Sequence, residues 1–228
     1  MHRLVRALAL AALFAPAAAR GLTAQNPPPQ GAPPQGPPPQ GQMPQGQVPP
    51  APLPPNGWRV DPNHSAVTFR VRHLGLTWVN GKFGQWRAEL VYDPNNPEAA
   101  SVTAHIQTAS VNTEVDRRDN DIRQNYFVVD SFPEITFTSQ HVERAGENRL
   151  RISSDLTLHG VTKPVVLETE INGMLNGSRA KRVSFTGTTT ISRREFGILR
   201  NPLVEGAQVV GDDIHITIDI EAIQPIAT

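Results

Sequence analysis

Histidine is the residue best suited to proton transfer or metal binding near neutral pH, and this chain of 228 residues contains seven. They stand at His2, His64, His73, His105, His141, His159 and His215. No two are spaced as H-x-H or as H-E-x-x-H, the patterns that place two metal ligands on one face of an element. The chain also lacks cysteine, which excludes zinc–thiolate sites, thiol nucleophiles and disulfides. We therefore expect no metal site, unless the fold brings three distant ligands together.

His73 ends the stretch SAVTFRVRH (residues 65–73), in which apolar and polar side chains alternate. A period of two places this histidine on the apolar face of a strand. There it is either a buried ring that forms a hydrogen bond with Ser110, Arg118 or Asp119, or a contact for the polar group of a ligand. The spacing of the other histidines disfavours a metal at this position.

Hydrolytic chemistry has no recognisable motif in the chain. There is no G-x-S-x-G segment, which would place a serine nucleophile on a strand-to-helix turn. A Ser-His-Asp triad cannot be identified from chain order alone. The paired carboxylates Asp212 and Asp213 fall in a turn, where solvation explains them. The residues alone therefore give no sign of hydrolytic chemistry.

The balance of charge argues against a nucleic-acid partner. The chain carries 21 Lys and Arg against 21 Asp and Glu. Between residues 116 and 123 arginines alternate with aspartates, as they do on a salt-bridged helix surface. The same arginines, with Arg193 and Arg194, could instead face an anionic headgroup or a membrane surface.

The N-terminal residues have the pattern of a cleavable secretory signal. Arg3 and Arg6 precede an apolar run over residues 7–19 that ends in small side chains. This run is shorter than the roughly 20 residues that a membrane-spanning helix needs. We assign residues 1–24 to a signal peptide. We predict a periplasmic or secreted protein with no integral membrane segment after cleavage.

Residues 25–57 form a low-complexity segment of proline, glutamine and glycine, with units such as PPPQG. The segment offers almost nothing to bury, so it cannot offset the entropy lost on ordering. We predict a disordered, partly polyproline-II linker. The alternative is a tract that docks in the aromatic groove of a partner.

Short runs of alternating apolar and polar residues recur from Trp58 onward. They predict eight strands, at residues 65–73, 86–92, 102–106, 135–141, 150–158, 165–171, 183–191 and 214–222. Only residues 116–127 have a helical pattern. A sheet of this kind buries one face by closing into a barrel or splitting into a sandwich. We predict an all-β fold, in which an eight-stranded barrel has room for one small or elongated ligand.

Short motifs in the same part of the chain follow one another in a specific order. They are DPNHS at 61–65, His73, GKF at 81–83, SVNT at 110–113, RD at 118–119, YF at 126–127, FPEITFTS at 132–139, LTLHGVTKP at 156–164 and REFG at 194–197. Each is weak alone, but the ordered set over residues 58–225 resembles the YceI-like, polyisoprenoid-binding family.

This resemblance implies an extended, lipocalin-like antiparallel β-barrel of eight strands with a short helical insert, over residues 58–228. It implies a binder or carrier that holds the apolar tail of a polyisoprenoid, quinone-like or other amphiphilic lipid, with no established catalytic activity. We therefore expect a protein that is not an enzyme and that has no cofactor, although an isoprenoid or quinone-like lipid can be bound as a ligand. We also consider a homodimer. The alternatives are an enzyme that acts on an isoprenoid-like substrate in the same pocket, and an interaction module in which the linker docks a partner.

Apolar and aromatic residues of the predicted barrel are the candidates for contact with the lipid, together with His73. These candidates are Phe69, Val71, His73, Phe83, Ile106, Phe127, Ile135, Phe137, Phe185 and Phe196. For each apolar residue, core packing is the equal alternative, and Phe132 is expected to be a packing anchor. Three positions depart from the family pattern: Asp121 replaces a common histidine, Val128 an acid, and Glu195 an aspartate.

Overall fold

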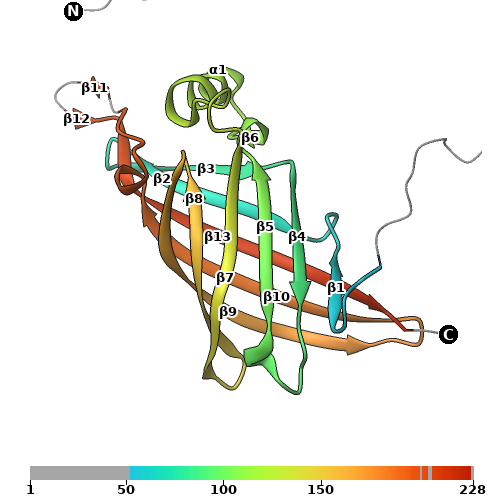
Figure 1. The fold of residues 1–228 in the computed structure, drawn as a ribbon. Helices are drawn as coiled ribbons and strands as arrows, with labels where there is room; N and C mark the ends of the chain where they lie inside the picture. The colour runs from blue at the N-terminus through green and yellow to red at the C-terminus, as the bar shows by residue number, and fades with distance from the viewer. Residues whose placement is uncertain (1–51, 201, 205–206, 227–228) are drawn as a thin grey trace, which may run out of the picture. The chain divides into compact units, whose positions relative to one another are not determined.

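The computed structural model describes residues 52–200, 202–204 and 207–226. The predicted signal (1–24) and residues 25–51 of the predicted linker (25–57) lie outside these residues. The ordered sheet begins at Gly57, one residue before the predicted start of the barrel. Figure 1 shows the strands wrapping around one interior, with a helical segment across one end.

The described residues form thirteen strands and five short helical segments. The strands are β1 (Gly57–Val60), β2 (Ala66–His73), β3 (Thr77–Phe83), β4 (Trp86–Val91), β5 (Ser101–Gln107), β6 (Val111–Asn112), β7 (Glu134–Gly146), β8 (Arg149–Leu158), β9 (Val161–Asn176), β10 (Ala180–Ser192), β11 (Leu203–Val204), β12 (Ala207–Gln208) and β13 (Val210–Pro225). The helical segments are η1 (Pro97–Ala99), η2 (Thr108–Ser110), α1 (Asp116–Asp121), η3 (Ile122–Phe127) and η4 (Arg193–Phe196).

Antiparallel pairing closes the sheet into an eight-stranded barrel. The strand order is β1-β4-β5-β7-β8-β9-β10-β13, and β13 pairs again with β1. One edge of β13 is shared, because residues 210–219 pair with β2 and residues 222–223 pair with β1. The β2–β3 hairpin therefore extends the wall at one end of the barrel, where β6 pairs with β3. The predicted all-β barrel is confirmed.

All eight predicted strands are present as β2, β4, β5, β7, β8, β9, β10 and β13, most of them longer than predicted. The sequence did not predict β1 and β3. Strand β1 has only four residues, too few for a pattern of alternation. Strand β3 contains the dipeptide Asn80-Gly81, which is a common turn signal but here lies within the strand.

Gly81 is needed in β3 because an aromatic ring covers it. It pairs with Phe69 of β2, and a Cβ atom at this position would lie 2.3 Å from the tip of the Phe69 ring. A glycine within a strand often marks such a close approach by another group. The Phe69 side chain can therefore fold flat over the strand and reach the barrel interior.

The turn between β8 and β9 sets the register of this hairpin, in which ten residue pairs run from Leu158–Val161 to Arg149–Glu170. His159 and Gly160 both have positive φ, at 53° and 74°, as the two central residues of a type I′ turn require. The Phe132 ring packs on this turn, with its centroid 4.3 Å from that of His159. Phe132 therefore serves as a packing anchor, as predicted.

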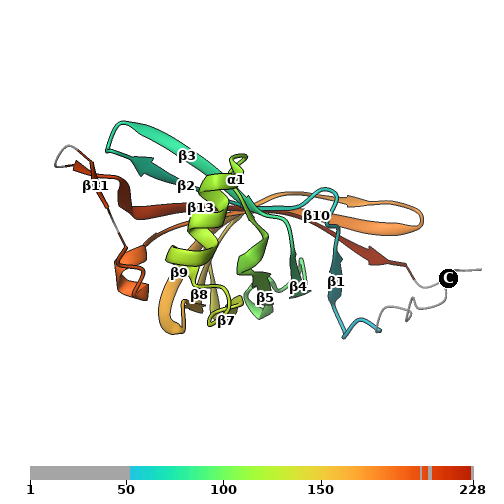
Figure 2. The ribbon, with the colours of Figure 1, turned by 90° about the horizontal axis from the view of Figure 1, so that it is seen from above.

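The helical segment predicted at 116–127 consists of one α-helical turn and a half, α1, followed by the π-helical segment η3. It ends at Val128, whose φ of 48° is unusual for a β-branched residue. The segment lies over one end of the barrel (Figure 2). Short π-helical stretches are frequent at functional sites, and this one ends in an aromatic pair.

Candidate ligand-binding cavity

The barrel encloses a cavity of about 410 Å³, a size typical of small-molecule sites. Its wall is almost entirely aliphatic and aromatic, with contributions from every long strand. Strand β13 contributes an unbroken row of inward isoleucines, Ile214, Ile216, Ile218 and Ile220. The alternation of this strand was visible in the sequence. Its wall-forming role was not, because a core strand has the same pattern.

Nine of the ten residues predicted for lipid contact line this cavity. They are Phe69, Val71, His73, Phe83, Ile106, Phe127, Ile135, Phe137 and Phe185. Phe196 does not line it. This residue lies in η4, is only 1% exposed and packs in the hydrophobic core. A phenylalanine in a short motif gives no sign of whether its ring faces the lumen or a neighbouring element.

Three phenylalanines form a row along the cavity wall beneath the helical segment. The ring centroids of Phe69 and Phe83 are 5.6 Å apart, and those of Phe83 and Phe127 are 5.9 Å apart. These distances are within the range of favourable aromatic pairs. The row joins the barrel wall to η3, so the helical segment is packed against the sheet by the same rings that line the cavity.

A cluster of aromatic residues closes the end of the barrel away from the helix. Trp58 and Tyr92 are buried, and the Trp58 Nε1 donates a hydrogen bond to the Tyr92 carbonyl at 2.8 Å. The ring of Tyr92 meets that of Phe185 edge to face at 5.0 Å. Burial raises the pKa of the Tyr92 hydroxyl, so this ring stays neutral. Buried aromatic rings therefore pack together at this end of the cavity, and none of the described residues that line it there is charged.

The charged side chains of the described cavity lining lie at the opposite end of the barrel. Of the described residues that line the cavity, the charged ones are Arg72, Arg118, Asp121 and Arg193. They come from the end of β2, from α1 and from η4, which all lie at the helix end of the barrel (Figure 1). The two ends of the lining therefore differ in polarity. The end at Trp58 and Tyr92 is uncharged and aromatic, and the end at the helical segment, which we call the mouth, is polar.

Arg118 is held in place by Thr113, which precedes α1. Its Nε donates to the Thr113 hydroxyl and its Nη2 to the Thr113 carbonyl, both at 2.7 Å. The buried Asp119 carboxylate accepts hydrogen bonds from the backbone N–H and the hydroxyl of Thr113. These contacts explain why a threonine precedes an Arg-Asp pair in the motif. They fix one cation at the mouth.

Arg193 is buried, with 2% of its surface exposed. Its guanidinium donates to the carbonyls of Ile198, Arg200 and Gly211 and to the Asp212 carboxylate. Burial lowers the pKa of Arg193, and the charge of Asp212 opposes that shift. Arg193 therefore links the segment after η4 to the start of β13 through hydrogen bonds. It therefore shapes the rim of the mouth, a role the sequence did not reveal.

Tyr126 brings a hydroxyl-bearing ring to the mouth from η3. Burial raises the pKa of its hydroxyl, and the nearby carboxylate of Asp121 adds to this rise. The Arg200 guanidinium lies over the ring, 5.9 Å from its centroid, and also pairs with Asp121 at 3.5 Å. A neutral phenol at this point can donate a hydrogen bond to the polar end of a ligand.

His73 lies at the mouth, but it is not a buried ring. The residue is exposed while one side of it lines the cavity. The partners proposed from the sequence are engaged elsewhere: Ser110 donates to the Gln107 carbonyl, and Arg118 and Asp119 both bind Thr113. The prediction of a buried, internally bonded histidine is therefore wrong. The strand ends at this residue, so the apolar face continues into solvent.

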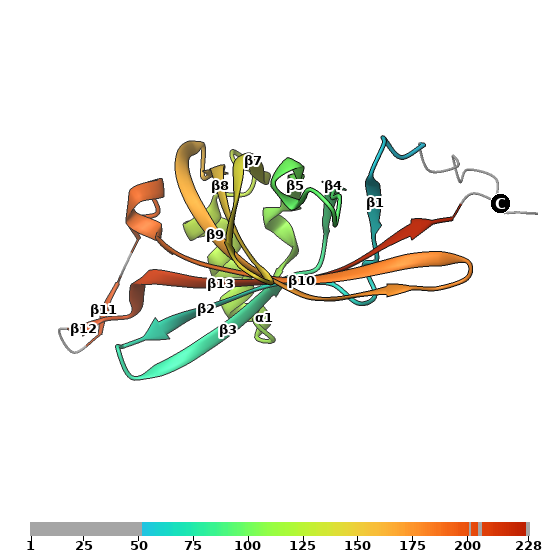
Figure 3. The ribbon, with the colours of Figure 1, turned by 90° about the horizontal axis from the view of Figure 1, so that it is seen from below.

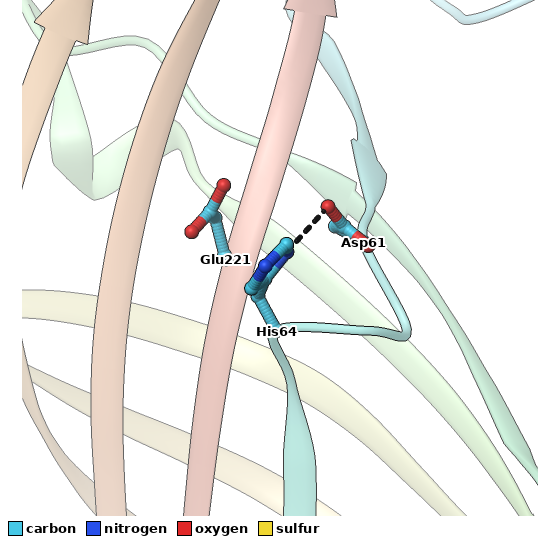
Figure 4. A group of neighbouring side chains, drawn as sticks. All are labelled: Asp61, His64 and Glu221. Carbon is cyan, nitrogen blue, oxygen red and sulfur yellow. Dashed lines mark hydrogen bonds and ion pairs between the residues drawn. The ribbon is translucent and has the colours of Figure 1, made fainter.

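The structure also brings together a polar cluster that the sequence could not show, because one of its members, Glu221, is far in the chain from Asp61 and His64. Asp61, His64 and Glu221 place their ligand-type atoms within 4.8 Å of one another (Figure 4). The His64 Nδ1 lies 2.9 Å from Asp61 Oδ2. Arg182 contacts the Glu221 carboxylate and lies 4.0 Å from Asp61 Oδ2.

This cluster has the residue types of a metal site, but its carboxylates already have cationic and hydrogen-bonding partners within the chain. The Arg182 guanidinium forms an ion pair with the Glu221 carboxylate. The backbone N–H of Asn63 donates a hydrogen bond to the other carboxylate oxygen of Asp61, Oδ1. The cluster therefore fastens the 61–65 loop, where the chain passes from β1 to β2, to the outer wall of β10 and β13.

No helix among the residues that the structure describes is both long and apolar enough to cross a bilayer.

Comparison with known proteins agrees with this architecture. A model of the YceI-like domain matches residues 58–222. A UPF0312 protein of Pseudomonas savastanoi pv. phaseolicola is 33% identical over 163 residues, which cover 71% of this chain and 82% of that protein.

Two solved structures are similar in fold. The Campylobacter jejuni YCEI protein aligns with a TM-score of 0.60 and 30% identity, over 67% of this chain and 89% of that one. A polyisoprenoid binding domain from Saccharophagus degradans, implicated in plant cell wall breakdown, aligns with a TM-score of 0.57 and 17% identity, over 73% and 97%. From residue 58 to residue 222, this chain belongs to the YceI-like domain family.

Proposed function

We propose that this protein is an exported binder or carrier that encloses the apolar tail of an amphiphilic lipid, of the polyisoprenoid or quinone-like class, inside its barrel. The observation that carries the proposal is the asymmetry of the cavity. Its wall is apolar along the barrel, aromatic rings close one end, and all of the charged lining residues among those described lie at the other. A ligand that fits this lining has a long apolar tail and one polar end.

The family and one structural relative support the same class of ligand. The chain belongs to the YceI-like family, and the Saccharophagus degradans domain of similar fold is a polyisoprenoid binding domain. Their support concerns the class of ligand only. The headgroup is set by the residues at the mouth, and Asp121 departs from the family pattern there.

Tail burial supplies enough free energy for such a mode of binding. Burial of a five-carbon isoprene unit stabilises the complex by about 4 kcal/mol, at about 0.8 kcal/mol per carbon. Ordering each unit costs roughly 0.5–1.5 kcal/mol. We expect affinity to depend mainly on the tail, and the headgroup to orient the ligand.

The residues at the mouth of the cavity favour a binding protein over an enzyme. His73 is exposed, and Arg118 and Arg193 are committed to hydrogen bonds that hold the mouth together. Turnover of an isoprenoid-like substrate that disappears in His73→Ala, with binding retained, would favour an enzyme instead.

Native mass spectrometry after gentle purification tests the proposal. We expect a co-purified lipid, or a complex with added polyprenyl alcohol or quinone and a raised midpoint of thermal unfolding. A protein that stays free of ligand and whose midpoint does not move with any of these lipids would refute it. Fractionation of cells that express the full chain tests export separately.

A further inference from the structure

Large apolar side chains are exposed around the polar mouth of the cavity. Leu76, at the tip of the β2–β3 hairpin, is 75% exposed; Leu199 and Leu203, which follow η4, are 62% and 66% exposed. A single exposed leucine on a protein surface is ordinary. Three leucines exposed at one end of a molecule, next to the opening of an apolar cavity, indicate a surface that contacts something apolar.

Hydrogen bonds hold these leucines in one continuous rim. The Leu74 N–H donates to the Val209 carbonyl at 3.0 Å, and the Val209 N–H donates to the Pro202 carbonyl at 3.1 Å. Arg193 binds the carbonyl of Arg200 in the same segment. Figures 2 and 3 show the β2–β3 tip and the β11–β12 hairpin at the same end of the molecule. We call Leu76, Leu199, Leu203, Arg72 and Arg200 the mouth rim.

The charge beside the rim favours an anionic partner. Residues 66–83, which include the whole hairpin, contain three basic side chains and no acidic one. The Arg72 guanidinium donates to the Leu76 carbonyl at 3.1 Å and lies 3.9 Å from the ring centroid of Trp78. Among the residues that the structure describes, it forms no ion pair with a carboxylate. Arg70 stacks on the same ring at 4.6 Å. Arginine and tryptophan beside exposed leucines are the composition of surfaces that bind at a membrane interface.

We propose that the mouth rim docks on the surface of a lipid bilayer that carries anionic headgroups, with its leucines inserted among the lipids. The choice of a bilayer follows from continuity, because Arg72, Val209 and Ile198 line the cavity and adjoin the rim. A tail that leaves the bilayer at this point enters the barrel without crossing water. The inference rests on the proposed function only for the lipid that enters the barrel. Docking on the bilayer depends on the mouth rim alone.

The opposite end of the barrel provides a matched control. Leu175, in the β9–β10 hairpin, is 63% exposed, and Arg179 and Lys181 stand nearby in the chain. That hairpin belongs to the end where Trp58 and Tyr92 close the cavity, because its strand β10 pairs with Ala222 of β13 through Val183. A bilayer at that end would not meet the opening of the cavity.

Because the chain has no cysteine, a single dye can be placed at each end. The full chain is prepared as Leu76→Cys, Leu199→Cys and Leu175→Cys, each labelled with an environment-sensitive fluorophore and mixed with vesicles of phosphatidylcholine and phosphatidylglycerol. We expect the emission to shift to the blue at positions 76 and 199 only. The shift should weaken with added salt and in pure phosphatidylcholine. In the unlabelled chain, Leu76→Glu should lower the partition into vesicles about tenfold and Leu175→Glu should not.

Three results would overturn the docking proposal. One is a shift at position 175 that equals or exceeds the shift at 76. Another is no shift at 76 and 199 with anionic vesicles. The third is a shift at 76 that depends on protein concentration without vesicles, which would assign the rim to a second copy of the chain. Capture of a polyprenyl alcohol from detergent-free solution by Leu76→Glu is measured in parallel, so that loss of docking and loss of lipid binding are told apart.

Discussion

Val128 is the side chain whose backbone conformation is least suited to its type. It adopts a φ of 48° directly after the aromatic pair that reaches the mouth, and it is a β-branched residue. The same position departs from the family pattern, in which an acid follows the pair. Asparagine and aspartate tolerate this conformation far better than valine, because their short side chains can bond the local backbone.

We therefore expect Val128→Asn to raise the free energy of unfolding by about 1 kcal/mol, through relief of backbone strain. Urea denaturation of the full chain measures the change. Val115→Asn is the matched control, because Val115 is also an exposed valine at this end but has an ordinary φ of −138°. A stabilisation of equal size in both variants would show that the strain at Val128 is not its cause.

The hydrogen bond between His64 and Asp61 makes a pH-dependent contribution to the stability of the barrel. The hydrogen bond to Asp61 raises the pKa of His64, and the same bond lowers the pKa of Asp61. The contribution of His64 is complete below its unfolded value of 6.5 and is lost as the pH rises through its raised pKa. The contribution of Asp61 is complete above its unfolded value of 3.8 and is lost as the pH falls through its lowered pKa.

The contribution of the His64–Asp61 pair to the free energy of unfolding should therefore be largest between about pH 4 and pH 6.5. Urea midpoints of the unaltered chain and of His64→Ala, compared from acid to alkaline pH, should differ most in that window. The difference should shrink on both sides, and it should be small because the pair is exposed to solvent. A difference that does not vary with pH would mean that the 61–65 loop is held by its other contacts.

Strand pairing explains why the fold could be predicted and where prediction failed. The period of two identified eight strands because each of them has one face in the barrel and one in solvent. It missed β3, in which Asn80-Gly81 resembles a turn, because the reason for the glycine is a ring on the neighbouring strand. Contacts between strands are not visible in one stretch of sequence.

Replacement of Gly81 should disturb both the wall and the cavity. A Cβ atom at this position meets the Phe69 ring, so Gly81→Ala must displace the ring that packs against Phe83. We expect the free energy of unfolding to fall by about 1–3 kcal/mol, as for other overpacked sites. Gly84→Ala is the control, since its nearest neighbour would be the Ser110 carbonyl oxygen at 3.8 Å. Equal losses in both variants, measured by urea denaturation, would contradict the role given to Phe69.

The site was partly predictable for a similar reason. Alternation and aromatic content pointed to nine residues that line the cavity. They could not separate these from Phe196, which packs outside it. His73 was placed correctly on the inner face, but its exposure depends on where the sheet ends. Arg193 was considered from the sequence as a contact for an anionic headgroup or a membrane surface, but its burial could not be predicted, because it arises from carbonyls that only the folded chain brings around it.

The barrel as a unit is an asymmetric container, and its volume can be altered without touching its ends. Ala88 and Ala104 face each other across β4 and β5 and both line the cavity. We expect Ala104→Trp to occupy part of the lumen and to weaken the binding of a long polyprenyl alcohol by about tenfold or more. Thr103→Trp is the control, because Thr103 adjoins Ala104 but does not line the cavity.

Isothermal titration of both tryptophan variants with the same lipid, together with their thermal midpoints, separates loss of space from loss of folding. Undiminished binding by a folded Ala104→Trp variant would show that the tail does not occupy the interior next to β4 and β5.

The dependence of affinity on tail length is the decisive measurement for a barrel that holds an amphiphile by its tail. A series of isoprenoid alcohols with one headgroup and increasing numbers of units should bind with affinities that rise about tenfold or more per unit. The rise should stop once the tail reaches the plug formed by Trp58 and Tyr92. An affinity that does not change with tail length, or that follows the headgroup alone, would contradict a tail enclosed in the barrel.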